Sequence, residues 1–202
     1  MSYDSLRNMA ETPMETQVRY LQTLRDAVIW KLDGLSEYDA RRPLTPTGTN
    51  VLGIVKHLAY VEAGYFGDTF GRPFPEPLPG FADDAEYNAD LWVEPGESRE
   101  YIVGLYRKAW AHAAETFEAS TLETMGKVPW WPEDRAEVAL HQILVHMITE
   151  TARHAGHVDI VRELIDDFVG MRPEATNLPE DDFDWPSYVA RIEAAARAAG
   201  ER

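Results

Sequence analysis

Apolar residues recur at three- and four-residue steps in five stretches of the chain, which is the spacing of the buried stripe of an amphipathic helix. The stretches cover residues 13–35, 51–70, 97–119, 134–166 and 185–199. The longest has the sequence DRAEVALHQILVHMITETARHAGHVDIVRELID. No stretch alternates apolar and polar residues over a convincing strand length, so the pattern predicts an all-α protein.

The connections between the predicted helices indicate how these helices are arranged. A turn-rich connector joins the first two, whereas the proline-rich segment 71–97 between the second and third is too long for a tight turn. This order predicts a four-helix bundle with a long crossover between helices 2 and 3, followed by an extra C-terminal helix. We expect a single domain over residues 1–202, with a core at about 14–170 and an extension at 171–202.

Several residues at the predicted helix ends are typical caps. Asn50 can cap the second helix, and Asp134 followed by Glu137 resembles a capping box for the fourth. The third helix is expected to begin at Ser98 or Glu97. The last helix is expected to dock on the domain through four apolar or aromatic side chains, Trp185, Tyr188, Val189 and Ile192.

Composition limits the classes of function. The chain has 202 residues, is 45% hydrophobic, has a formal net charge of −16 and contains no cysteine. The acidic balance argues against nucleic acid and anionic membranes as partners, and the chain can supply no thiolate of its own. Neither a secretory signal nor a run of about 18 apolar residues is evident, so we expect a cytoplasmic protein.

One stripe of the predicted helix 134–166 carries most of the candidate chemistry. Since a helix advances about 100° per residue, His146 and His154 lie about 40° to either side of Glu150, and His157 about 20° from it. The flanking positions are apolar, and polar groups placed among core residues need a partner. A bound divalent metal ion is one such partner, and an ordinary hydrogen-bonded core histidine is the alternative for each residue taken singly.

Helix geometry restricts which residues can share one ion. His146 and His154 are about 12 Å apart along the axis, so one ion cannot bind both. The pairs Glu150 with His154, His146 with Glu150, and His154 with His157 all remain open. A third ligand must come from another helix, and His57 is the only histidine of the predicted helix 51–70. Two ligands from one helix and one from another would leave an open coordination position, as in catalytic sites.

Two motifs resemble the signature helices of the DinB-like superfamily: VLGIVKHLAYVE at 51–62 and ITETARHAGHVDIVREL at 148–164. The usual pattern in that superfamily is His-x-x-x-His, and here Glu150 occupies the place of the first histidine and His154 that of the second. With ETARHAGH at 150–157, the sequence resembles an actinobacterial branch of unknown function. The resemblance covers about residues 14–170 and implies a metal-binding four-helix bundle with His57, Glu150 and His154 as ligands.

Some relatives in this superfamily are transferases that use mycothiol or bacillithiol, and the resemblance implies that kind of activity here. The expected cofactors are a divalent metal, zinc first and nickel, manganese or iron(II) as alternatives, together with a mycothiol-type thiol. The thiol would bind the ion as thiolate and attack a small electrophile, while Arg153 and His157 would orient the bound molecules. Homodimers are common among such bundles.

Two other functions fit the same residues. The first is a non-catalytic, metal-stabilised binding or stress-response protein, and the second is a metal-dependent hydrolase in which the ion activates water. The absence of a His-Glu-x-x-His motif argues against a peptidase of that kind. Thiol dependence would separate a transferase from a hydrolase, and the number of protein ligands would separate both from a structural site.

Overall fold

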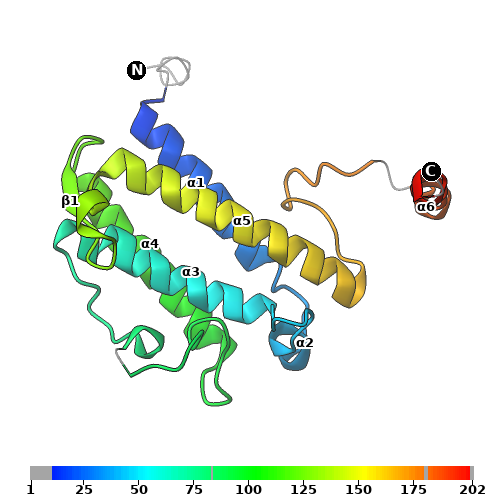
Figure 1. The fold of residues 1–202 in the computed structure, drawn as a ribbon, viewed down its shortest axis with the longest axis horizontal. Coiled ribbons are helices and arrows are strands. Elements are labelled where there is room, and N and C mark those ends of the chain that lie inside the picture. Colours follow the sequence, from blue (N-terminus) through cyan, green and yellow to red (C-terminus); the bar gives the residue numbers. More distant parts are fainter. Residues whose placement is uncertain (1–10, 83, 180–181, 201–202) are drawn as a thin grey trace, which may run out of the picture.

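The computed structural model describes residues 11–82, 84–179 and 182–200, and these are mostly helical, in agreement with the all-α prediction. The helices, labelled in Figure 1, are α1 (Pro13–Trp30), α2 (Glu37–Arg41), α3 (Val51–Phe66), α4 (Arg99–Glu118), α5 (Leu140–Asp166) and α6 (Trp185–Gly200). Short 3₁₀ turns, η2 to η4, occur at Asp68–Phe70, Pro79–Phe81 and Glu133–Arg135. The strands β1 (Met125–Lys127) and β2 (Glu137–Ala139) pair antiparallel, with Met125 opposite Ala139.

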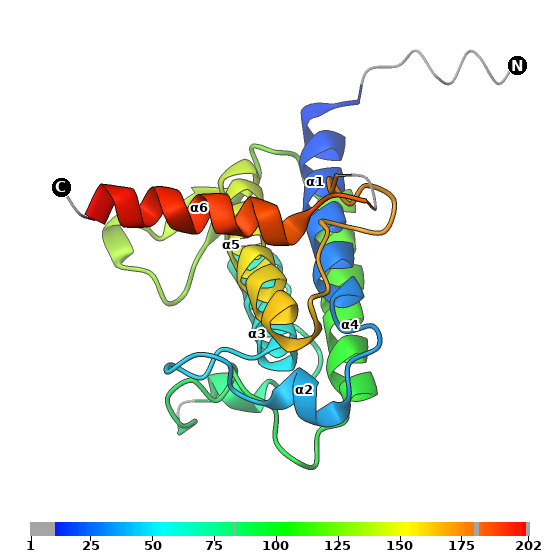
Figure 2. The same ribbon diagram turned by 90° about the vertical axis from the view of Figure 1, so that its right-hand side faces the viewer.

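Helix α3 lies at the centre of the fold. It packs against α4 and α5, and α1 packs against α5 (Figures 1 and 2). Fourteen of its sixteen residues are buried, and the other two, His57 and Val61, are partly exposed. His57 and Val61 are four residues apart and therefore share one face of the helix. The accessible strip of this buried helix is consequently the place to look for a site.

Side-chain caps set the starts of α3 and α4, at the predicted cap Asn50 and at Ser98. The Asn50 side chain accepts a hydrogen bond from the backbone N–H of Gly53, and that of Ser98 accepts one from Tyr101. The predicted capping box of Asp134 and Glu137 is wrong. Residues 133–135 form a 3₁₀ turn and Glu137 lies in β2, so α5 begins only at Leu140. Pairing with β1 takes residues 137–139 out of the helix.

Two other predicted helices are shorter than expected, and one short helix was not foreseen. The first ends at Trp30 rather than at residue 35, and the second ends at Phe66 rather than at residue 70. The chain turns away from α3 at Gly67. A Cβ atom at this position would lie 2.3 Å from the Ala63 carbonyl oxygen, so only glycine fits there. The connector between α1 and α3 contains the five-residue helix α2.

The long crossover after α3 returns to the N-terminal half of that helix. The side chains of Asn50, the N-cap of α3, and Lys56 on α3 donate hydrogen bonds to the backbone carbonyls of Leu91 and Trp92. A Cβ on Gly53 would lie only 2.0 Å from the Leu91 oxygen, so the absence of a side chain lets the two backbones approach. The crossover is thereby fixed against α3 beside His57.

Helix α6 lies apart from the other helices in the view of Figure 1. No residue of α6 is buried, and the four side chains expected to dock it are between 38% and 58% exposed. The predicted docking is therefore wrong. Among the described residues, no helix is both long and apolar enough to cross a membrane. Residues 1–10, on which the prediction about a secretory signal rests, lie outside the described part of the chain.

Candidate metal centre

The three residues implied as ligands converge across the α3–α5 interface. His57 comes from α3, and Glu150 and His154 come from successive turns of α5. Glu150 Oε1 lies 3.4 Å from His57 Nε2 and 3.0 Å from His154 Nε2, and the two imidazole rings are 4.8 Å apart. One potential ligand atom from each residue falls within 4.8 Å of the other two. No other group of three or more such side chains occurs in the part of the chain that the structure describes.

Asp90 on the crossover holds His57 in place. Its Oδ2 lies 2.5 Å from His57 Nδ1, and both side chains are largely buried. A carboxylate at Nδ1 favours the tautomer with the proton on Nδ1, which leaves the Nε2 lone pair directed at Glu150 and His154. No local signal in the sequence identifies Asp90, because it lies 33 residues from His57 in a segment without regular structure.

Burial and neighbouring charges together shift the pKa values of the three converging residues. Burial disfavours the imidazolium of His57, but the hydrogen bonds and charges of Asp90 and Glu150 outweigh it and raise the pKa of His57. Burial and the neighbouring His57 together lower the pKa of His154. Burial alone would raise the pKa of Glu150, yet His154 and His57 lower it, so Glu150 is held as a carboxylate.

The donor set fits a small divalent ion. In a tetrahedral zinc site with bonds of about 2.0–2.1 Å, two ligand atoms lie about 3.3 Å apart. The distances from Glu150 Oε1 to His57 Nε2 and His154 Nε2, 3.4 and 3.0 Å, are close to this value. Two imidazole nitrogens and a carboxylate are also a usual facial set for zinc, iron(II), manganese and nickel. His154 Nδ1 is buried without a hydrogen-bond partner among the described residues. In that part of the chain, the His154 ring therefore forms a hydrogen bond only through Nε2, with Glu150.

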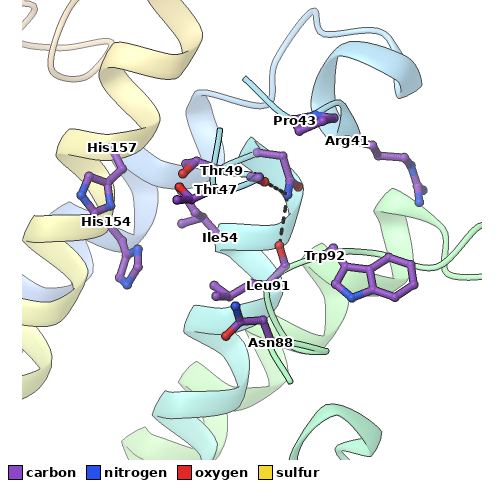
Figure 3. Close-up of a pocket in the computed structure, with 12 residues that line it drawn as sticks. Arg41, Pro43, Thr47, Thr49, Ile54, Asn88, Leu91, Trp92, His154 and His157 are labelled. Carbon is purple, nitrogen blue, oxygen red and sulfur yellow. Dashed lines mark hydrogen bonds between the residues drawn. The ribbon is translucent and has the colours of Figure 1, made fainter. Parts of the chain in front are cut away.

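A pocket of about 580 Å³ adjoins the cluster at the N-terminal end of α3. Figure 3 shows His154 and His157 facing this pocket from α5, with Trp92 on the far side. Thr47, Thr49 and several further polar and apolar residues line it: Arg41, Pro43, Gly48, Asn50, Ile54, Asn88 and Leu91. The cluster therefore opens onto a space large enough for a small molecule.

The structure places the remaining candidates outside the converging group. The His157 ring lies 5.4 Å from that of His154 and lines the pocket, while Arg153 is exposed on α5. His146 lies between aromatic rings, 4.7 Å from Tyr65 and 5.5 Å from Trp131. His146 is therefore a packing residue, which resolves one of the alternatives left open by the helix geometry.

Residues 16–167 match the protein family described as mycothiol-S-transferase. The match spans about three quarters of the chain. The chain belongs to the mycothiol-S-transferase family. The predicted relationship to mycothiol-dependent transferases is therefore confirmed. The matched region contains His57, Glu150, His154 and Asp90, and it ends one residue after α5, so α6 lies outside it. No match was found among curated proteins.

Proposed function

We propose that this member of the mycothiol-S-transferase family is a divalent-metal-dependent enzyme that joins a mycothiol-type thiol to a small electrophile. The observation that carries the proposal is the convergence of His57, Glu150 and His154 beside an open pocket. Three protein ligands with a vacant coordination position are typical of catalytic rather than structural sites. Zinc is the ion we favour, with nickel, manganese and iron(II) as alternatives.

Each residue has a definite task in this proposal. A bound ion would supply the positive charge that stabilises a thiolate at its open position. Asp90 keeps the Nε2 lone pair of His57 directed inward, and Glu150 adds a negative charge to the ligand set. His157, on the pocket wall, is placed to accept the proton that the thiol releases, and Arg153 at the exposed side of α5 offers a positive charge to the incoming molecules.

The proposed site depends on the helical core being a bundle. The contacts of α3 with α4 and α5, and of α1 with α5, support the interpretation of these four long helices as one four-helix bundle. We take residues 14–170 as the core of a single domain. In that arrangement the ligands come from inward faces of neighbouring helices, where metal sites of bundles are built.

The proposal is tested by incubating the protein with mycothiol and monobromobimane, with and without a chelator. We expect conjugation that the chelator abolishes and zinc restores, and a Glu150→Ala variant with at least about tenfold weaker zinc affinity and less conjugation. His141→Ala, an exposed histidine on the same helix, is the matched control. Conjugation no faster than the uncatalysed reaction would refute the proposal, and turnover without any thiol would indicate a hydrolase.

A further inference from the structure

A second pocket continues the accessible strip of α3 beyond the metal centre. It has a volume of about 360 Å³ and is lined by Val61, Tyr65, Phe81 and Trp130, which we call the aromatic pocket. Val61 and Tyr65 follow His57 at successive four-residue steps, so all three lie on one face of the helix. Val61 is about 6 Å along the axis from His57. The aromatic pocket thus begins one helical turn after His57 on the same face of α3.

Two large aromatic side chains of this pocket remain uncovered. Trp130 is 50% exposed and Phe81 is 48% exposed, although each packs against α3 on one side. The Trp130 ring lies 5.1 Å from that of Tyr65, and the Phe81 ring lies 5.2 Å from that of Tyr60. Apolar surface that is both exposed and concave marks a binding site for an apolar group.

The position of Trp130 depends on a glycine. A Cβ atom on Gly64 would lie 2.9 Å from the Trp130 ring, so the indole rests directly against the backbone of α3. Trp130 comes from the segment between β1 and β2, and Phe81 from the turn η3 of the crossover. Three separate parts of the chain therefore build one apolar wall, and none of its four side chains is charged.

We infer that the aromatic pocket binds the uncharged, apolar and preferably aromatic part of the electrophile that receives the thiol. This inference rests on the proposed function. With an arylmethyl halide, the ring would occupy the aromatic pocket and the methylene carbon would point toward His57. The thiolate sulfur then forms a bond to that carbon, the halide leaves with the electron pair of the broken bond, and the thiol proton goes to His157 or solvent. A small polar electrophile gains nothing from the pocket.

Binding of an apolar probe tests the pocket without requiring any activity. The uncharged dye N-phenyl-1-naphthylamine is titrated into the full chain, and its fluorescence reports occupancy. We expect about tenfold weaker binding in Trp130→Ala and weaker binding in Gly64→Ala, whose added methyl group displaces the indole while alanine favours the helix. Trp185→Ala is the matched control, since Trp185 is 45% exposed on α6. Equal binding by Trp130→Ala and the unaltered chain would overturn the inference.

Kinetics then connect the pocket to the electrophile. In the conjugation assay, Trp130→Ala should raise the KM for benzyl bromide about tenfold and leave that for iodoacetamide unchanged. An equal change for both electrophiles would refute a role in selecting the substrate. Dye binding that depends on Trp130 in a protein without conjugating activity would leave the pocket established and refute only the proposed function.

Discussion

At the scale of single residues, Asp90 is the side chain that orients His57 toward the other two candidate metal ligands. Its contact of 2.5 Å with His57 Nδ1 fixes the ring so that Nε2 faces Glu150 and His154. Periodicity along α5 and the resemblance of two motifs were enough to name the three converging residues. Asp90 could not be found that way, because the approach of the crossover to α3 is a tertiary contact at Gly53 and Asn50.

Replacing Asp90 with asparagine is expected to weaken zinc binding by about 10- to 100-fold, the usual effect of losing a carboxylate behind a histidine ligand. The reason is that an amide neither holds the Nδ1 proton as strongly nor adds a negative charge. Competition with a chromophoric chelator measures the affinity. Asp84→Asn, an exposed carboxylate of the same crossover, should leave the affinity unchanged. Equal affinities for the Asp90 variant and the unaltered protein would remove Asp90 from the site.

The raised pKa of His57 makes metal binding sensitive to mildly acidic pH. An ion needs the neutral imidazole, so protons compete with it once the pH falls to the raised pKa of His57. As the pH is lowered, we expect the zinc affinity to begin to fall at a higher pH than it would with a histidine ligand of ordinary pKa. In Asp90→Asn the onset should shift to lower pH, because the charge that raises this pKa is gone. Titrations between about pH 5 and pH 8 would show it, and an unshifted onset would contradict the explanation.

At the scale of elements, the sequence predicted helices better than their ends. The spacing of apolar residues and the polar residues before them correctly predicted where α3 and α4 begin, because these starts depend on the local hydrogen bonds of Asn50 and Ser98. The start of α5 was misplaced because pairing of β2 with β1 overrides the local Asp-x-x-Glu signal. The docking of α6 was also mispredicted, since an amphipathic pattern shows that a helix has an apolar face but not what covers it.

A buried ion pair joins α1 to α3. Glu62, fully buried, accepts hydrogen bonds from Arg25 at 2.5 and 3.1 Å and from Tyr106 on α4 at 3.0 Å. Burial, followed by the Glu62 charge, raises the pKa of Tyr106 well above its usual value, so the phenol donates as a neutral group.

Glu62→Leu should lower the free energy of unfolding by about 3–5 kcal/mol, because it leaves the Arg25 guanidinium buried without its counter-charge. The double variant Arg25→Leu with Glu62→Leu should recover much of this loss, since no unpaired charge remains. Arg197→Leu, which breaks an exposed pair with Glu193 on α6, is the control and should have no measurable effect. Urea unfolding measures all three. A double variant as unstable as Glu62→Leu would contradict the account.

At the scale of the whole molecule, the fold divides into a helical body that holds the site and a C-terminal segment that does not contribute to it. The family match covers residues 16–167, and both pockets beside the metal centre are lined by residues within that range. The residues of α6 make no buried contact with the body. The activity we propose should therefore reside in the body alone.

Ending the chain after residue 182 is expected to leave the melting temperature and the zinc affinity unchanged, because the removed helix buries none of its residues. Differential scanning calorimetry and the chelator competition would test this. A lower melting temperature would mean that α6 packs on the body, as its four apolar and aromatic side chains first suggested.

The central claim is that His57, Glu150 and His154 bind one divalent ion and leave a coordination position open toward the pocket. Anomalous diffraction from crystals grown with zinc tests this most directly. We expect one peak about 2.0–2.2 Å from His57 Nε2, a Glu150 carboxylate oxygen and His154 Nε2, with no fourth protein ligand. A peak elsewhere, or an ion enclosed by four protein ligands, would contradict the claim.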